Sequence, residues 1–215
     1  SKVNDETVKR TGAKALGLIG SDAKSATTIL TTLLKAEDPL QRIGAAVALW
    51  RITGEAIYLR TVSEAIQVGT PDAAHEALLS LGEIGEPARA AAKVVVGALA
   101  HTDADVRRAA AAVLLGWGDD VVPQIVASLN DTARVQPLTV LQLLANIVDR
   151  SRRLSIESTS APLARRKQSA EILTKQIAPV LIARLTTGAA NEREAAAQAL
   201  GKGGPVSYTH LRAHE

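Results

Sequence analysis

An internal repeat constrains the fold of this chain more than any other feature of its sequence. The segment at residues 5–20 returns in related form at 38–52, 77–85, 103–118, 140–147 and 191–201. Equivalent leucines are separated by 33, 32, 33, 30 and 56 residues, and they are Leu16, Leu49, Leu81, Leu114, Leu144 and Leu200. Near-equal periods of this length are typical of stacked repeats, whose units bury their apolar faces against one another. The sequence therefore predicts a repeat array with an insertion in its longest period.

Each period predicts two helices. The first places small and apolar residues at helical spacing, as at Val8, Gly12, Ala15 and Ile19. Glycine is the usual residue just after a helix C-terminus, and the glycines at that point are Gly20, Gly54, Gly85 and Gly118. Second helices are expected at about 23–35, 55–68, 87–100 and 121–129. No segment shows sustained alternation with a period of two, so strands are not expected.

Composition excludes several classes of protein. The chain has no Cys, so disulfides, zinc fingers, iron–sulfur ligation and thiol catalysis are excluded. Its net charge of +3 is too small to predict a nucleic-acid partner. It has no apolar run of about 18 residues, which a membrane-spanning helix would need. We therefore expect a soluble protein without a membrane span and favour the cytoplasm. The absence of Met indicates a fragment or a processed product.

The repeat has a recognisable consensus. Residues 5–20 and 103–118 follow most closely the pattern Asp-x-x-Val-Arg-x-x-Ala-Ala-x-Ala-Leu-Gly-x-Ile-Gly. This pattern resembles the HEAT repeat, and more closely the short HEAT-like repeat that is also found in phycobilin lyases. The resemblance covers about residues 2–201. It implies an all-α fold, a right-handed α-solenoid of stacked helix pairs, and it is specific for fold rather than for function.

The repeat boundaries predict the domain organisation. We expect one HEAT-like solenoid at 1–205, incomplete at both ends, with repeats at about 1–36, 37–69, 70–102, 103–131, 132–188 (insertion at 150–165) and a partial repeat at 189–205. Residues 206–215 resemble a translated sequencing adapter, and we interpret them as a non-native tail. The partial repeat would lack its second helix. Residues 195–200 are therefore expected to lack full cover, with fraying from about Asn191.

The resemblance also implies roles for single residues. In HEAT families the Arg and Asp of the repeat commonly pair between neighbouring units. The residues at these positions are Lys9, Arg42, Arg107 and Arg193, with Asp38 and Asp105. Trp50 and Trp117 lie at apolar helix positions, and we predict that they belong to the core or its edge.

One His-Glu pair raises the question of a metal site. His75-Glu76 lies where deoxyhypusine hydroxylases, which are di-iron HEAT-like enzymes, carry metal ligands. Such a centre needs several facing pairs, and the equivalent positions hold Arg10-Thr11, Ile43-Gly44 and Arg108-Ala109. We therefore predict no metal and no cofactor, and a solvated helix face for His75-Glu76. His101, in a turn, is predicted to be a capping or surface residue.

The insertion carries the candidate binding residues. Its Ser, Thr and Pro content predicts a loop after about Asp149, with helix resuming near Arg165 and a kink at Pro179. The candidate partner-binding residues are the basic ones around this loop: Arg150, Arg152, Arg153, Arg165, Arg166 and Lys167. They could bind phosphate or an acidic partner. The alternative is a solvated loop whose charges lie at helix ends.

We predict a non-catalytic scaffold that binds another protein, not an enzyme. The partner, of unknown identity, would lie on the face of the second helices and on the basic insertion. Three alternatives stay open: a bilin-lyase-like component, another HEAT-like enzyme such as a metal-dependent hydroxylase, and a nucleic-acid-binding module. The second helices carry charges of both signs, and aromatic residues are 2% of the chain, which disfavours nucleic acid.

Overall fold

The structure is a computed structural model that describes residues 2–129, 137–157 and 163–203. Across these ranges every regular element is a helix and no strand occurs, so the predicted all-α class is confirmed. The chain forms two compact units, Ser1–Val113 and Leu114–Glu215, and their boundary falls within α7 (Ala104–Trp117). The tail predicted at 206–215 lies outside the described residues.

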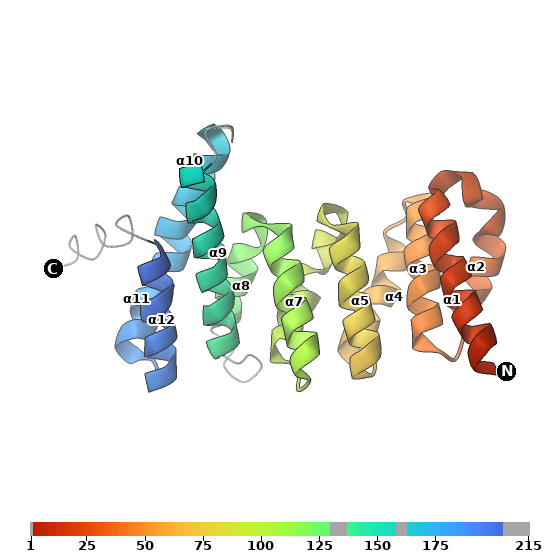
Figure 1. Cartoon of the computed structure of the whole chain (residues 1–215), viewed down its shortest axis with the longest axis horizontal. Helices are drawn as coiled ribbons and strands as arrows, with labels where there is room; N and C mark the ends of the chain where they lie inside the picture. Colours follow the sequence, from red (N-terminus) through yellow and green to blue (C-terminus); the bar gives the residue numbers. More distant parts are fainter. Residues whose placement is uncertain (1, 130–136, 158–162, 204–215) are drawn as a thin grey trace. The chain divides into compact units, whose positions relative to one another are not determined.

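The first unit consists of helix pairs. Its elements are α1 (Lys2–Ile19), η1 (Gly20–Ala26), α2 (Thr27–Leu33), α3 (Pro39–Thr53), α4 (Ile57–Val68), α5 (Pro71–Ile84), η2 (Glu86–Ala91), α6 (Ala92–Gly97), η3 (Ala98–Ala100) and the start of α7. Helix α3 packs against α1 on one side and α5 on the other, and α4 packs against α3, α5 and α6 (Figure 1). Two layers of helices result, compatible with a helical repeat.

The second unit follows the same principle. Its elements after α7 are η4 (Asp119–Val121), α8 (Val122–Ser128), α9 (Pro137–Glu157), α10 (Leu163–Ile172), the π-helical η5 (Leu173–Ile177), α11 (Ala178–Thr187) and α12 (Ala190–Gly203). Helix α12 packs against α9 and α11, and η5 contacts α8, α10 and α11. Buried apolar residues of this unit come from α8, α9, α11 and α12. Figure 1 shows α9 and α12 side by side.

Left-handed glycines end the first helices, as predicted. Gly20, Gly54, Gly85 and Gly118 have φ values of 71°, 75°, 74° and 86°, a region that strains residues with a Cβ atom. The N–H of Gly54 donates to the carbonyl of Trp50 at 2.8 Å, so the glycine caps its helix. The chain then turns directly into the second helix, in three cases through a 3₁₀ segment (η1, η2 and η4). The predicted second helices are confirmed to within a few residues.

Small residues bring successive first helices into close contact. A Cβ atom added to Gly17 of α1 would lie 2.9 Å from the Cα of Ala48 in α3. One added to Gly82 of α5 would lie 3.3 Å from Cγ2 of Val113 in α7. Ala13 and Ala48 are buried in this contact. The alanine and glycine content of the repeat is therefore the feature that lets the helices approach.

Arginines close the turns that lead into α3, α7 and α12. A guanidinium nitrogen of Arg42 donates to the carbonyls of Ala36 and Glu37, both at 2.7 Å. Arg107 donates in the same way to His101 and Thr102, both at 2.7 Å. These carbonyls follow the preceding helix and have no helical partner, so the arginine satisfies groups that would otherwise depend on water. Arg193 makes the corresponding bond to Gly188 at 2.9 Å.

These contacts correct the predicted Arg–Asp ladder. Lys9 pairs with Asp5 of its own helix at 2.5 Å, and Asp105 pairs with Arg108, also within one helix. Asp38 accepts a hydrogen bond from the N–H of Leu40 as an N-cap. The ladder prediction is therefore wrong for these contacts, because Asp38 caps a helix start and Asp105 pairs within its own helix, while the arginines reach carbonyls within hydrogen-bond distance.

Ion pairs between the helix pairs come from other residues. Glu83 of α5 lies 3.2 Å from Arg51 of α3 and 3.7 Å from Lys14 of α1. Three successive first helices thus share one carboxylate. Because Lys14 and Glu83 are about half exposed, this network adds specificity of register more than stability.

The insertion is more helical than predicted. Helix α9 runs to Glu157, so the expected helix end near Asp149 is wrong. Helix resumes at Leu163, close to the predicted point, and 158–162 lie outside the described residues. The irregularity expected at Pro179 is present as the π-helical turn η5, in which the N–H of Ala178 donates to Leu173. Proline cannot donate a helical hydrogen bond, and the wider turn directly precedes it.

The partial repeat is better covered than predicted. Helix α12 extends to Gly203, and Ala196, Ala199 and Leu200 are at most 5% exposed. The expectation that residues 195–200 lack full cover is therefore wrong for Ala195, Ala196, Ala199 and Leu200, because α9 and α11 together cover that side of α12. Ala197 is exposed, as expected. Trp117 is buried and Trp50 is half-buried, as predicted.

Replacing Gly17 tests the close contact of α1 and α3. We expect Gly17→Ala to lower the free energy of unfolding, because overpacking against the Ala48 backbone costs about 1–3 kcal/mol. The matched control is Gly12→Ala on the same helix. No atom lies within 4 Å of its added Cβ, so this change should raise stability by up to about 1 kcal/mol. Urea unfolding followed by circular dichroism measures both, and equal effects would contradict the close contact.

Neighbouring arginines test the turn contacts. Arg107→Gln removes two hydrogen bonds to carbonyls and should lower the free energy of unfolding by about 1.5 kcal/mol or more. Arg108→Gln removes only an exposed pair with Asp105 and should change it by less than about 0.5 kcal/mol. Chemical unfolding of the wild type and the two variants measures these changes in the free energy of unfolding. A loss for Arg108→Gln that matched the loss for Arg107→Gln would show that the turn contacts carry no special weight.

Acid should weaken the start of α7. Asp103 accepts hydrogen bonds from the N–H groups of Val106 and Asp105, and these lower the pKa of its carboxyl group. A lowered folded-state pKa stabilises the fold fully above the unfolded pKa of about 3.9 and loses that effect as the pH falls through the folded value. Below about pH 4 the wild type should therefore lose more stability than Asp103→Asn, which caps without titrating. The free energy of unfolding of both proteins, measured over a pH series, tests this prediction. Equal losses of stability in the wild type and in Asp103→Asn would contradict this role of Asp103.

Candidate functional site

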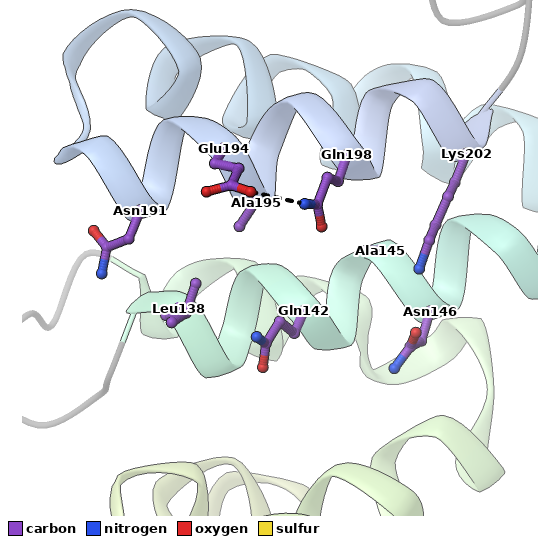
Figure 2. A pocket seen from close by; sticks show the side chains of 9 residues that line it. All are labelled: Leu138, Gln142, Ala145, Asn146, Asn191, Glu194, Ala195, Gln198 and Lys202. Carbon is purple, nitrogen blue, oxygen red and sulfur yellow. Dashed lines mark hydrogen bonds between the residues drawn. The ribbon is translucent and has the colours of Figure 1, made fainter.

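A groove lies between α9 and α12 in the second unit. Its volume is about 480 Å³, within the range of ligand-binding clefts. The lining residues are Leu138, Gln142, Ala145 and Asn146 of α9 and Asn191, Glu194, Ala195, Gln198 and Lys202 of α12 (Figure 2). Helical spacing explains the set, because residues three, four and seven positions apart share one face.

The groove has an apolar floor and polar walls. Ala145 and Ala195 are buried where the two helices meet, and their small side chains leave the groove open. Gln142, Asn146 and Gln198 are exposed and stand on the two walls (Figure 2). Each amide side chain has both a hydrogen-bond donor and an acceptor. The arrangement suits a ligand that itself alternates donors and acceptors.

Two of these amides have no hydrogen-bond partner among the described residues. Gln142 and Asn146 make no side-chain hydrogen bond within the part of the chain that the structure describes. On the opposite wall Gln198 donates to Glu194 at 3.3 Å (Figure 2). Asn191 accepts a hydrogen bond from the N–H of Glu192. The α9 wall therefore offers the readier hydrogen-bonding groups.

Opposite charges mark the α12 wall. Glu194 and Lys202 lie eight residues apart, which corresponds to about 12 Å along a helix. Figure 2 shows Lys202 extending toward α9, near Asn146. A ligand in this groove would meet a negative group near one end and a positive group near the other. The groove lies between first helices of the repeats, whereas the sequence analysis expected a partner on the second helices.

Arg150, one of the basic residues of the insertion, is used inside the unit. A guanidinium nitrogen of Arg150 lies 3.0 Å from Asp119, and another donates to the carbonyl of Leu115. Asp119 also accepts a hydrogen bond from Ser169 at 2.5 Å. Both partners of the ion pair are mostly buried, so this cluster joins α9 and α10 to the start of η4. No signal in the sequence relates Asp119 to residues so distant along the chain.

The partner-binding role of the remaining basic residues stays a prediction. Arg153 is exposed and pairs with Asp149 of its own helix at 2.7 Å. The side chains of Arg152, Arg165, Arg166 and Lys167 lie outside the described part of the structure. Of the six candidate residues, the structure therefore describes internal contacts for Arg150 and an exposed side chain for Arg153.

A second cavity in this unit has acidic walls. Its volume is about 330 Å³, and its lining includes Asp119, Asp120 and Glu171 together with Lys175 and Gln176. Lys175 lies 2.5 Å from Glu171 and holds the pKa of that carboxyl group below its usual range. Asp119 is engaged by Arg150 and Ser169. Within this cavity the charged groups mainly neutralise one another.

The His-Glu pair does not extend into a cluster. His75 and Glu76 are half-buried on α5, more enclosed than the solvated face that the sequence predicted. Among the described residues no three His, Asp or Glu side chains converge as metal ligands would. His101 acts as a cap, since its Nδ1 accepts a hydrogen bond from the N–H of Asp103 at 3.0 Å. In the described ranges no single helix is long and apolar enough to cross a membrane.

Comparison with known proteins does not identify a family for this chain. No protein-family model matches the chain, and no curated protein matches it. It is similar to an engineered protein of known crystal structure, with 21% identity, a TM-score of 0.47, and coverage of 94% of this chain and 92% of that chain. At that TM-score the likeness supports no inference about fold or function. Membership of the HEAT family stays a prediction from the sequence pattern.

Proposed function

We propose that the chain is a non-catalytic scaffold of HEAT-like repeats, arranged as a right-handed solenoid, that binds a segment of another protein. The groove between α9 and α12 is the proposed binding surface. The observation that carries this proposal is the pair of exposed amides on α9, Gln142 and Asn146, which make no side-chain hydrogen bond to the residues that the structure describes.

Chemistry favours an extended peptide as the ligand. A peptide backbone presents one donor and one acceptor per residue, and a side-chain amide can bond to both. Leu138 and Asn146 lie about 12 Å apart along α9, a length that matches about four residues of extended chain.

Charge adds a preference for orientation. Glu194 favours a basic side chain of the ligand near one end of the groove, and Lys202 favours an acidic one near the other. Buried Ala145 and Ala195 leave space for one small apolar side chain between them. The preferred ligand is therefore a short extended segment with a basic residue, a small apolar residue and an acidic residue in sequence.

A non-catalytic role agrees with the state of the titratable groups. In the described part of the chain, Asp103 and Glu171 are the carboxyl groups with a resolved pKa shift, and both values are lowered. Both groups are exposed, and neither lines the groove. Acid–base catalysts usually need pKa values moved toward neutrality in a cleft, which supports binding rather than turnover.

A random-peptide display library selected on the purified chain tests the groove. Enriched peptides should bind the wild type and lose about tenfold in affinity with the Gln142→Ala, Asn146→Ala double variant, since each hydrogen bond contributes about 0.5–1.5 kcal/mol. Fluorescence anisotropy with labelled peptides measures the change. Both residues are exposed, so unchanged thermal unfolding should accompany the lost affinity.

Gln67→Ala is the matched control, because Gln67 is an exposed amide on α4 of the other unit. It should bind the enriched peptides as tightly as the wild type. The groove would be excluded if the double variant and this control retained the same affinity, or if no peptide were enriched. Stoichiometric iron in the purified chain, or turnover of a bilin, would contradict the non-catalytic role.

A further inference from the structure

Helix α1 carries an exposed apolar face. Val8 and Ile19 are 64% and 59% exposed, and Gly12 and Ala15 between them are also exposed. These four residues recur every three or four positions, so they lie along one side of the helix and form what we call the α1 face. A contiguous apolar surface of this kind usually marks a site of interaction.

The same repeat positions are buried on other first helices. The equivalents of Gly12, Ala15 and Ile19 in α3 are Ala45, Ala48 and Ile52, with exposures of 0%, 1% and 4%. In α3 this side packs against α1. The equivalents of Gly12 and Ala15 in α12 are Ala196 and Ala199, both 0% exposed, and α12 packs against α9. The α1 face is thus a helix-packing surface on which no helix packs in the described chain.

Packing between first helices follows a fixed register. In two of the helix pairs, a glycine of one helix meets the residue at the Ala15 position of the next helix. Gly17 meets Ala48, and Gly82 meets Val113, with 2.9 and 3.3 Å from an added Cβ to the nearest atom. Other first helices carry larger residues at the Gly17 position, such as Trp50 of α3, so glycine marks the closest form of this packing. A partner that packs on the α1 face as closely as α1 packs on α3 would present a glycine opposite Ala15.

Helix α12 presents that glycine. Leu200 is the equivalent of Leu16, so Gly201 occupies the position of Gly17. Gly201 is exposed, and no atom lies within 4 Å of a Cβ added to it. Ala197 occupies the position of Ala13, which α3 covers on α1, and it is exposed as well. We call Ala197 and Gly201 the α12 face.

We propose that two copies of this chain associate head to tail, with the α1 face of one copy packed on the α12 face of the next. Gly201 of one copy would contact Ala15 of the other, as Gly17 contacts Ala48 within the chain. The contact would bury Val8 and Ile19, which are otherwise exposed to water. The two faces differ and lie on different helices, so the interface is heterologous and permits growth beyond a dimer.

Sedimentation equilibrium over a concentration series tests the association. The average mass of the wild type should rise past that of a dimer. Ile19→Glu and Gly201→Glu should each hold the chain at monomer mass, because each introduces a charge on one face. Both positions are exposed, so the variants should keep the circular dichroism of the wild type. Val68→Glu, at an 86% exposed position on α4, should leave the association unchanged.

Mixing the two blocked variants identifies the orientation. Ile19→Glu keeps an intact α12 face, and Gly201→Glu keeps an intact α1 face, so an equimolar mixture should form dimers and nothing larger. A wild type that stays monomeric at every concentration would overturn the proposal. So would a dimer broken by Ile19→Glu but not by Gly201→Glu, which would indicate pairing of two α1 faces. Equal disruption by Val68→Glu would point to non-specific association.

Discussion

Packing between successive first helices requires side chains small enough for their backbones to touch. At Gly17 there is no room for a Cβ atom beside the Ala48 backbone, and at Gly82 the neighbouring Val113 leaves little. Close approach lets each helix pair bury its apolar stripe mainly with alanine and branched aliphatic residues, which agrees with a chain that has no Phe or Met. The turns between helices and the groove between α9 and α12 both depend on this short distance between neighbouring first helices.

The turns depend on backbone groups that the helices leave unsatisfied. Glycines in the left-handed region stop the first helices, and Arg42, Arg107 and Arg193 bind carbonyls ahead of the next ones. A family pattern had suggested that these arginines pair with aspartates of neighbouring units. Asp38 instead caps α3, because an N-terminal N–H group lies within reach of its short carboxylate, and Asp105 pairs with Arg108 of its own helix. An arginine at a fixed repeat position therefore has a local structural role.

The groove and the two helix faces show different degrees of predictability. The α1 and α12 faces follow from the repeat register, since a position buried on one helix is marked as a packing position on all of them. The groove does not follow, because Gln142 and Asn146 are remote from Asn191 and Gln198 along the chain and nothing in their local pattern relates them. The Asp119–Arg150–Ser169 cluster likewise joins residues that are distant along the chain, so its contacts do not follow from the local sequence. Sequence reasoning weighed the conspicuous arginines of the insertion and passed over unremarkable amides.

Local rules were enough to derive the class of fold, the helix pairs and the four glycine turns, because hydrophobic period and the conformational freedom of glycine act within a few residues. The sequence alone was misleading about α9, whose helix continues past Asp149, and about α12, which α9 and α11 enclose. Only the tertiary structure decided which helices cover each other, which arginines are consumed by internal contacts and where a groove remains. The physical reason is that burial depends on what another segment brings alongside, and a segment's own residues do not specify that neighbour.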